Sequence, residues 1–235
     1  MRFSKATLAL IIIIGVLLID QISKFYIKTT MSIGDEIVVF DWFRIHFVEN
    51  EGMAFGLSFG GEYGKLALTL FRMIAVAGLG YFIVQLCRKP ETTRGLVICM
   101  ALILAGALGN IIDSIFYGVI FNHSYHQIAS FLPPQGGYGT LLHGRVVDML
   151  YFPLINWQGT LPTWIPVWGG TFSSIEFFQP VFNIADTAIS TGVFAIILFQ
   201  RKILLHGLEA KPTANNNNNN NSTTASVTST GTDNL

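Results

Sequence analysis

Residues 6–27 read ATLALIIIIGVLLIDQISKFYI, a stretch that is apolar without interruption as far as Asp20. A helix needs roughly 20 apolar residues to cross the hydrocarbon core of a bilayer. Arg2 and Lys5 precede the stretch, as they would in a cleaved signal peptide, but no small-residue cleavage site follows its apolar core. The pattern therefore predicts an uncleaved membrane-spanning helix, and this helix decides the class of fold.

Three further apolar stretches are long enough to span a membrane, at residues 66–86, 95–117 and 181–199. The composition agrees, because 51% of the 235 residues are hydrophobic and only 12% are charged, whereas soluble domains carry about 25% charged residues. Acidic and basic residues number 14 each, so the net charge is zero and no basic excess exists to attract nucleic acid. We expect an all-α integral membrane protein with a bundle of four spanning helices, present as a monomer and without a nucleic-acid partner.

Three groups of basic residues fall on one side of the four predicted spans: Arg2 and Lys5; Arg88, Lys89 and Arg94; Arg201 and Lys202. Because cytoplasmic loops are enriched in Lys and Arg, we expect both termini in the cytoplasm. The two longer segments, residues 28–65 and 118–180, are then expected outside. The membrane-embedded domain is expected to cover residues 1–203, and the Asn-, Ser- and Thr-rich tail at 204–235 is expected to be disordered.

The first outer segment is not a simple linker. Residues 37–48 are rich in Val, Ile, Phe and Trp, and Arg44 and His46 alternate with Ile45 and Phe47. Alternation of this kind is typical of β-strands. We therefore expect a hairpin or small sheet that lies on the membrane.

Four carboxylates are expected at one depth near the outer surface. Asp20 and Asp113 come late in outward-going spans, Asp186 comes early in an inward-going span, and Asp148 precedes a short apolar run in the second outer segment. Ionisable residues within spans are costly and mark functional sites by default. Their common depth indicates a polar site at the outer membrane surface.

Helical spacing places several polar residues on shared faces. Gly106, Asn110 and Asp113 are four and three residues apart, and Asn183 and Asp186 are three apart. Residues three or four apart lie side by side on a helix. Each of the last two spans therefore presents one polar face toward the predicted site.

The carboxylates divide into two groups by expected role. Asp20 and Lys24, four residues apart, and Asp113 are most simply explained as polar contacts between helices. For Asp148 and Asp186 we favour chemistry, because two carboxylates in a partly dry site act as a general acid and a general base that share one proton. Sequence spacing alone does not show that these two residues meet.

Five short motifs, in order along the chain, resemble those of the bacterial lipoprotein signal peptidases (signal peptidase II). They are Asp20-Gln21-Ile22-Ser23-Lys24, Asn50-Glu51-Gly52-Met53-Ala54-Phe55, Gly106-Ala107-Leu108-Gly109-Asn110-Ile111-Ile112-Asp113, Gly144-Arg145-Val146-Val147-Asp148 and Phe182-Asn183-Ile184-Ala185-Asp186. The resemblance covers residues 1–203. It implies a four-helix bundle in the bacterial cytoplasmic (inner) membrane, with a small extracytoplasmic β-sheet cradle, a short interfacial helix and an active site at the outer face.

The resemblance also implies an activity, that of an aspartic endopeptidase with Asp148 and Asp186 as its catalytic dyad. The implied substrate is a prolipoprotein whose cysteine carries a diacylglyceryl group, cleaved before that cysteine in contact with membrane lipid, with no cofactor and no metal. The sequence leaves open which aspartate carries the resting proton. The supporting residues that we expect around the dyad are Asn50, Gly52, Gly106, Asn110, Asn183, Asp20, Lys24 and Asp113.

Two departures from the family pattern stand out. Ser114 follows Asp113 where the family has an arginine, and the segments 119–142 and 151–181 are longer than in its compact form. Arg72, in the outer half of the second span, either supplies the missing cation or only extends toward the interface. Both hypotheses stay open at this point.

Other classes of protein agree less well with the pattern. A small proton-coupled transporter would use Asp113 and Asp186 as a relay, but transporters usually have more spans and internal repeats. A non-enzymatic membrane scaffold would leave the aligned carboxylates without a role. A zinc peptidase is disfavoured because the chain has no His-Glu-x-x-His motif.

Overall fold

The computed structural model describes residues 3–51, 61–153, 155–161, 170–177 and 180–199. All of them belong to the compact unit Met1–Arg201. Gly52 of the second motif and the tail at 204–235 lie outside the described residues.

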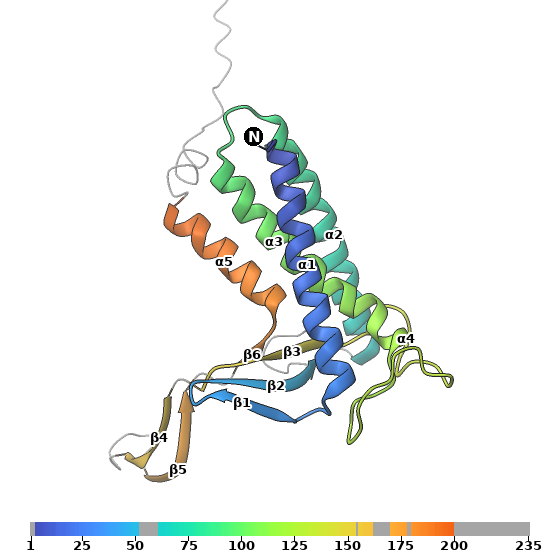
Figure 1. The fold of residues 1–235 in the computed structure, drawn as a ribbon, viewed down its shortest axis with the longest axis vertical. Coiled ribbons are helices and arrows are strands. Elements are labelled where there is room, and N and C mark those ends of the chain that lie inside the picture. Colours follow the sequence, from blue (N-terminus) through green and yellow to red (C-terminus); the bar gives the residue numbers. More distant parts are fainter. Residues whose placement is uncertain (1–2, 52–60, 154, 162–169, 178–179, 200–235) are drawn as a thin grey trace, which may run out of the picture. The chain divides into compact units, whose positions relative to one another are not determined.

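Three helices in the described part of the chain are long and apolar enough to cross a membrane. They are α1 (Lys5–Thr30), α2 (Gly61–Arg88) and α3 (Arg94–Ile112), the last of which continues through a π-helical turn, η2 (Asp113–Tyr117), and a short helix, α4 (Gly118–Ile120). These helices run side by side in Figure 1. They correspond to the first three predicted spans.

The fourth apolar helix begins later than the sequence predicts. Residues Val181–Phe182 form a strand, β6, and the helix α5 covers Ile184–Phe199. At 1.5 Å per residue, its 16 residues extend about 24 Å, less than the roughly 30 Å of a bilayer core. The predicted start at residue 181 is wrong because pairing with the sheet holds the first two residues in an extended conformation.

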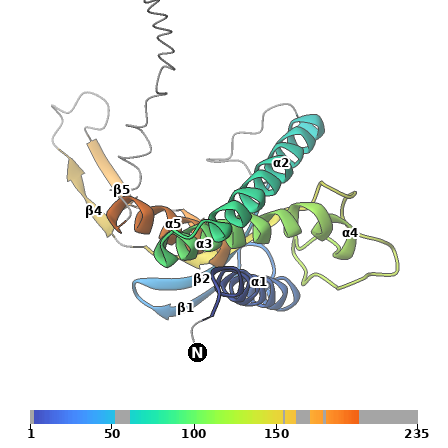
Figure 2. The same cartoon turned by 90° about the horizontal axis from the view of Figure 1, so that it is seen from above.

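Helix α3 contacts α1, α2 and α5, and Figure 2 shows it among these three helices. Glycines allow α3 and α5 to approach closely. A Cβ added to Gly106 would lie 2.2 Å from the backbone oxygen of Ala185, and one added to Gly192 would lie 2.7 Å from that of Cys99. Small residues at such contacts are typical of helices that pack in membranes.

We expect Gly106→Ala to lower the free energy of unfolding by about 1–3 kcal/mol, the usual cost of overpacking. Gly78→Ala on α2 is the matched control, since its added Cβ meets nothing within 4 Å and alanine favours the helix. Thermal unfolding of both variants in the same detergent measures the difference. Equal midpoints would contradict the close packing of α3 on α5.

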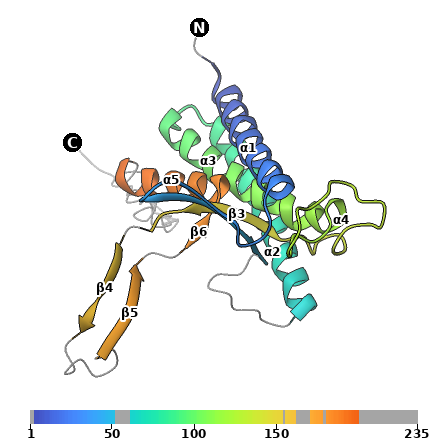
Figure 3. The ribbon, with the colours of Figure 1, turned by 60° about the horizontal axis from the view of Figure 1, so that its bottom comes forward.

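A four-stranded antiparallel sheet in the order β1-β2-β3-β6 lies at one end of the helices (Figures 1 and 3). Its strands are β1 (Glu36–Phe40), β2 (Phe43–Asn50), β3 (Val146–Tyr151) and β6 (Val181–Phe182). The hairpin predicted at residues 37–48 is therefore confirmed as β1 and β2. In the register of β2 with β3, Val48 pairs with Asp148 and Asn50 pairs with Val146.

The described chain contains more strand and less helix than an all-α bundle. A second antiparallel pair joins β4 (Ile155–Leu161) to β5 (Gly170–Phe177). The helices of the described residues include no separate short interfacial helix, because α4 follows directly on α3 and η2. The fold is thus a set of apolar helices combined with small antiparallel sheets.

The buried core at the junction of helices and sheet is apolar. It contains Ile27, Met31, Phe47, Tyr117, Phe121, Ala129, Val147 and Met149. These residues come from the end of α1, from β2 and β3, and from the segment around α4. The core thus fixes β3, the strand of Asp148, against the ends of the helices.

Candidate active site

The structure brings Asp148 and Asp186 to the two sides of one asparagine. Asp148 lies on β3, and Asp186 lies in the first turn of α5, which follows β6. The antiparallel pairing of β3 with β6 returns the chain to Asp148 just before α5 begins. The Nδ2 of Asn183 donates to Asp148 Oδ1 at 2.7 Å, and its backbone N–H donates to Asp186 Oδ2 at 3.4 Å.

Asn183 is fully buried, and every polar group of its side chain is used. Its Oδ1 accepts from the backbone N–H of Asp186 at 2.8 Å, so Asn183 also caps the N-terminus of α5. Its Nδ2 has further acceptors in Asn110 Oδ1 at 3.1 Å and the Val147 carbonyl at 3.3 Å. The residue therefore fixes the start of α5 relative to β3.

A second amide connects Asp186 to a buried cation. Asn110 on α3 donates from Nδ2 to Asp186 Oδ1 at 2.7 Å. The Oδ1 of Asn110 accepts from Lys24 Nζ at 2.9 Å. Because Lys24 needs an acceptor there, the amide of Asn110 is oriented with its N–H groups toward the carboxylate.

Lys24 is completely buried and lies among three oxygen acceptors. Its Nζ lies 2.9 Å from Asp20 Oδ2, 2.7 Å from Asp113 Oδ2 and 2.9 Å from Asn110 Oδ1. An ammonium group has three N–H donors, and all three find a partner here. A buried charge is tolerated when it is paired and hydrogen-bonded in this way.

The carboxylates around Lys24 hold the two elements that present the candidate dyad. Asp20 Oδ1 accepts from the backbone N–H of Ala185 at 2.9 Å, at the positive N-terminal end of α5. Asp113 accepts from Gln21 Nε2 at 2.9 Å and from the backbone N–H of Val147 at 3.4 Å. The network thus joins α1 to the start of α5, and α3 to β3.

The two candidate catalytic carboxylates lie in different electrostatic environments. Asp148 is only 3% exposed, and burial, followed by the negative charge of Asp186, raises its pKa to about 7. Hydrogen bonds from Asn50 and Asn183 oppose this increase in pKa. Asp186 is half-buried, and the guanidinium of Arg72 on α2 interacts with its charge.

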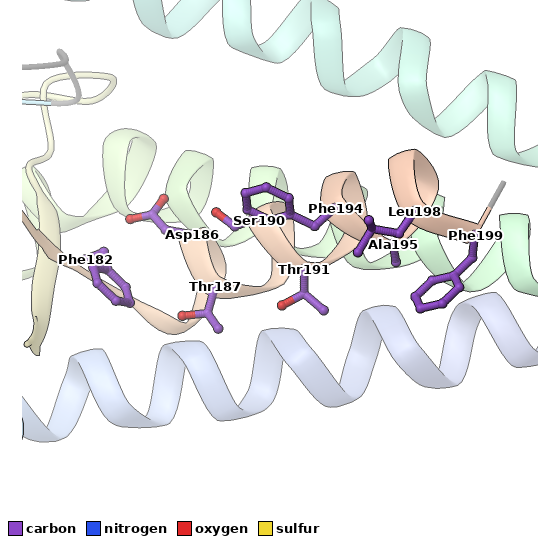
Figure 4. A pocket seen from close by; sticks show the side chains of 9 residues that line it. All are labelled: Phe182, Asp186, Thr187, Ser190, Thr191, Phe194, Ala195, Leu198 and Phe199. Atoms are coloured by element: carbon purple, nitrogen blue, oxygen red, sulfur yellow. The ribbon is translucent and has the colours of Figure 1, made fainter. Parts of the chain in front are cut away.

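Asp186 also lies at one end of an apolar groove of about 640 Å³ along α5. Figure 4 shows Phe182 and Asp186 at one end of the groove and Phe199 at the other. The side chains that line it are Phe182, Asp186, Thr187, Ser190, Thr191, Phe194, Ala195, Leu198 and Phe199. The arrangement places one carboxylate beside a long apolar surface that carries three hydroxyl groups.

The predicted site residues fall into three groups. The structure joins most of them in the network just described: Asp148, Asp186, Asn50, Asn110, Asn183, Asp20, Lys24 and Asp113. Gly106 lies at the contact between α3 and α5, facing Ala185. Gly52 lies outside the described residues.

Gln21 belongs to the first quoted motif, but its part in the site was not predicted from the sequence. Its Nε2 contacts Asp20 and Asp113, and its Oε1 accepts from the Tyr117 hydroxyl at 3.3 Å. Its position next to Asp20 at the polar end of a span was the available signal. Ser114 donates to the Asn110 carbonyl at 2.9 Å, so the hydroxyl at this departure from the family pattern bonds within its own helix.

Within the described ranges, no group of three or more His, Cys, Asp or Glu side chains is arranged to hold a metal ion. Paired carboxylates with distinct surroundings are able to act as a proton donor and a proton acceptor.

Apolar helices that end at a buried network of carboxylates and amides are typical of a membrane protein with a polar functional site. The family model for signal peptidase (SPase) II matches residues 12–201. The chain therefore belongs to the signal peptidase II family.

Curated relatives agree with this assignment, and a solved structure resembles the fold. The chain is 49% identical over 209 residues to a lipoprotein signal peptidase of Porphyromonas gingivalis, covering 89% of this chain and 88% of the relative. It is 38% identical over 186 residues to that of Amoebophilus asiaticus, covering 78% and 73%. A solved structure described as a bacterial membrane enzyme matches with a TM-score of 0.53 at 26% identity, covering 83% of this chain and 92% of the other. These relatives give no support to the transporter alternative.

Proposed function

We propose that this chain is an aspartic endopeptidase that removes the signal peptide from prolipoproteins, cutting before the diacylglyceryl-modified cysteine. Membership of the signal peptidase II family supports the substrate class. The observation that carries the aspartic mechanism is the pair of asparagine amides that connects Asp148 to Asp186. Amides are not ionisable, so they hold the two carboxylates in place without competing for the proton.

In the proposed mechanism, Asp186 is the base and Asp148 is the acid. Asp186 takes a proton from a water molecule as the water oxygen bonds to the carbonyl carbon, and Asp148 donates its proton to the developing oxyanion. When the C–N bond breaks, the proton held by Asp186 passes to the leaving amine and Asp148 recovers its own. The raised pKa of Asp148 and the interaction of Arg72 with Asp186 support this distribution of charge.

We expect kcat/KM to fall as the pH rises through about 7, the pH at which Asp148 loses its proton. Below that pH, Asp148 is protonated and able to donate; above it, the carboxylate is charged. A pH–rate profile on a lipidated substrate measures this, and a rate that increases through pH 7 would contradict the assignment of the acid.

The carboxyl group of Asp148 also makes the free energy of unfolding depend on pH. The unfolded chain ionises Asp148 near pH 3.8, whereas the folded chain keeps the proton up to about pH 7. Its contribution to the free energy of unfolding is therefore complete below pH 3.8 and is lost as the pH rises through about 7.

The groove along α5 is the proposed binding site for the signal peptide of the substrate. A signal peptide has an apolar helical core, and the groove presents exposed apolar side chains such as Phe194 and Leu198. Asp186 at its end would then lie close to the scissile bond. A helix bound there keeps the lipid of the modified cysteine in the bilayer while the bond reaches the dyad.

We further propose the topology that the charge pattern predicts. The proposed fourth span contains α5, both termini are cytoplasmic, and the dyad lies at the outer face of the bacterial cytoplasmic membrane. One contact supports this arrangement, because Lys5 at the start of α1 donates to the Lys89 carbonyl in the α2–α3 link at 2.7 Å. The basic residues of these segments therefore share one end of the helices, and Asp20 and Asp113 lie toward the other end. We also propose that the protein is a monomer, with a membrane domain at residues 1–203 and a separate tail at residues 204–235.

A gel-shift assay tests the proposed substrate. The purified chain is incubated with a prolipoprotein whose cysteine is diacylglyceryl-modified, and with the same protein left unmodified. We expect the signal peptide to be lost from the modified form only. Equal cleavage of both forms, or an intact modified substrate after incubation with folded enzyme, would refute it.

A further inference from the structure

A second pocket, of about 420 Å³, lies apart from the groove at Asp186 and shares no residue with it. The side chains that matter for its chemistry are Lys65, Arg145, Glu51, Tyr138, Thr140 and His143. None of these residues takes part in the network around Lys24. The pocket is polar, whereas the groove along α5 is apolar.

The segment that follows α4 forms one wall of this pocket and is held by backbone hydrogen bonds. Tyr138 N–H donates to the Phe121 carbonyl at 2.9 Å, and Gly139 N–H donates to the Gly118 carbonyl at 2.8 Å. The Thr69 hydroxyl on α2 donates to the Leu142 carbonyl at 3.3 Å. The wall is therefore fixed to both α4 and α2, the helix that provides Lys65.

Arg145 provides one cation at the pocket, and its contacts with the neighbouring carboxylates are long. Its guanidinium lies 5.4 Å from the centre of the Tyr138 ring. Its nearest acidic contacts are Glu49 at 3.5 Å and Glu51 at 3.6 Å, beyond the usual 2.7–2.9 Å of a strong charge-assisted hydrogen bond. Arg145 thus retains donors for a further anion.

Lys65 provides the second cation and is only 7% exposed. Its charge interacts with those of Glu51 and Arg145 across the pocket. Among the residues that the structure describes, Lys65 forms no ion pair within 4 Å. A buried ammonium group without a close anion is costly, so this position favours an external anion.

The nearby carboxylates neutralise the two cations only in part. Glu49 is almost fully buried and already forms an ion pair with Lys28, and it also accepts from the Ser124 hydroxyl at 3.1 Å. Glu51 is half-exposed, with 50% of its side chain accessible. The pocket itself therefore combines two cations with one loosely held carboxylate.

The position of Lys65 along its helix indicates the depth of the pocket. Lys65 lies near the start of the candidate span Tyr63–Arg88, where the apolar segment of α2 begins. The polar headgroup region of a bilayer borders the hydrocarbon core at that depth. Phosphate groups are abundant in this layer.

We propose that this pocket binds a phosphate group, with Lys65 and Arg145 as its cations and with His143 and Thr140 as hydrogen-bonding partners. Arginine and lysine are the usual ligands of phosphate, and Thr140 and His143 already lie 2.9 Å apart at the pocket. The phosphate belongs either to a phospholipid headgroup or to a free anion. The site is distinct from the dyad and does not depend on the peptidase mechanism.

The test follows the thermal unfolding midpoint of the full chain in detergent at constant ionic strength. Three titrants are compared: short-chain phosphatidylglycerol, inorganic phosphate, and short-chain diacylglycerol, which lacks phosphate. We expect a saturable increase in the midpoint with one or both phosphate compounds and none with diacylglycerol. A response to the lipid only identifies a headgroup site, and a response to inorganic phosphate identifies a site that also takes a free anion.

Variants with opposite expected effects make the test specific. Lys65→Gln removes a charge-assisted bond, so we expect the apparent Kd to weaken about tenfold. Glu51→Gln removes a competing carboxylate, so we expect a tighter Kd. Lys5→Gln is the control, because Lys5 lies at the start of α1 beside the α2–α3 link and does not line the pocket. We expect this variant to leave the Kd unchanged.

Three results would overturn the proposal. The first is the absence of a saturable response to either phosphate compound, and the second is an equal response to diacylglycerol. The third is a Kd that neither Lys65→Gln nor Glu51→Gln changes. Should Lys65→Gln fail to fold, Glu51→Gln still decides the question, because it predicts tighter binding.

Discussion

Asp148→Asn and Asp186→Asn are each expected to lower the rate of signal-peptide cleavage by about 10²–10⁴-fold, the usual contribution of general acid–base catalysis. An amide at position 186 has no basic oxygen to take a proton from water. An amide at position 148 has no acidic proton to give to the oxyanion. Initial rates on a lipidated prolipoprotein measure both effects.

Stability measurements separate this loss from misfolding. Asp148 is buried with a raised pKa, so a neutral amide of similar shape is compatible with its surroundings near neutral pH. We therefore expect Asp148→Asn to keep the thermal midpoint within a few degrees of the unmodified protein. Asp41→Asn, at the exposed turn between β1 and β2, is the matched control and is expected to cleave at the normal rate. A dyad variant that keeps half of the normal rate would refute the assignment.

Lys24→Met is expected to give the largest loss of stability, about 3–5 kcal/mol, because removing one partner of a buried ion pair leaves uncompensated charge. Asp20 and Asp113 are both fully buried, and both pair with Lys24 Nζ at less than 3 Å. Cleavage is expected to fall as well, since Lys24 orients Asn110 toward Asp186. Unfolding in a fixed detergent, followed by circular dichroism, measures the stability.

A neutral triple variant is the control for this prediction. Asp20→Asn and Asp113→Asn combined with Lys24→Met remove all three charges, so we expect much of the lost stability to return. The recovery would show that the cost arises from unpaired charge rather than from lost packing. Equal stability of Lys24→Met and the unmodified protein would contradict the buried network.

The sequence was sufficient to predict those parts of the fold that depend on local pattern. Apolar length predicted the helices that became α1, α2 and α3, and alternation predicted the β1–β2 hairpin. The order of the predicted spans also placed Asp20, Asp113, Asp148 and Asp186 at one expected depth, but it did not predict which of these carboxylates meet. Burying a carboxylate in an apolar environment requires partners, and the partners of each one became visible only in the structure.

Features that depend on contacts distant in the chain were not predictable from local pattern. Val181 and Phe182 are as apolar as the helix that follows, and only their pairing with β3 makes them a strand. Asn183 was predicted on one face of a helix, yet it caps that helix and contacts Asp148. The pocket with Lys65 and Arg145 combines α2 with a segment that hydropathy leaves unassigned.

In the proposed reaction, this chain cuts a lipidated prolipoprotein through Asp148 and Asp186. Mass spectrometry of the products after prolonged incubation tests this reaction, with the unmodified chain and each dyad variant in parallel. We predict that the unmodified chain yields a mature protein whose first residue is the diacylglyceryl-modified cysteine, while both variants leave the substrate intact. The same mature product, formed to completion by either Asp148→Asn or Asp186→Asn, would show that these two carboxylates are not the catalytic dyad.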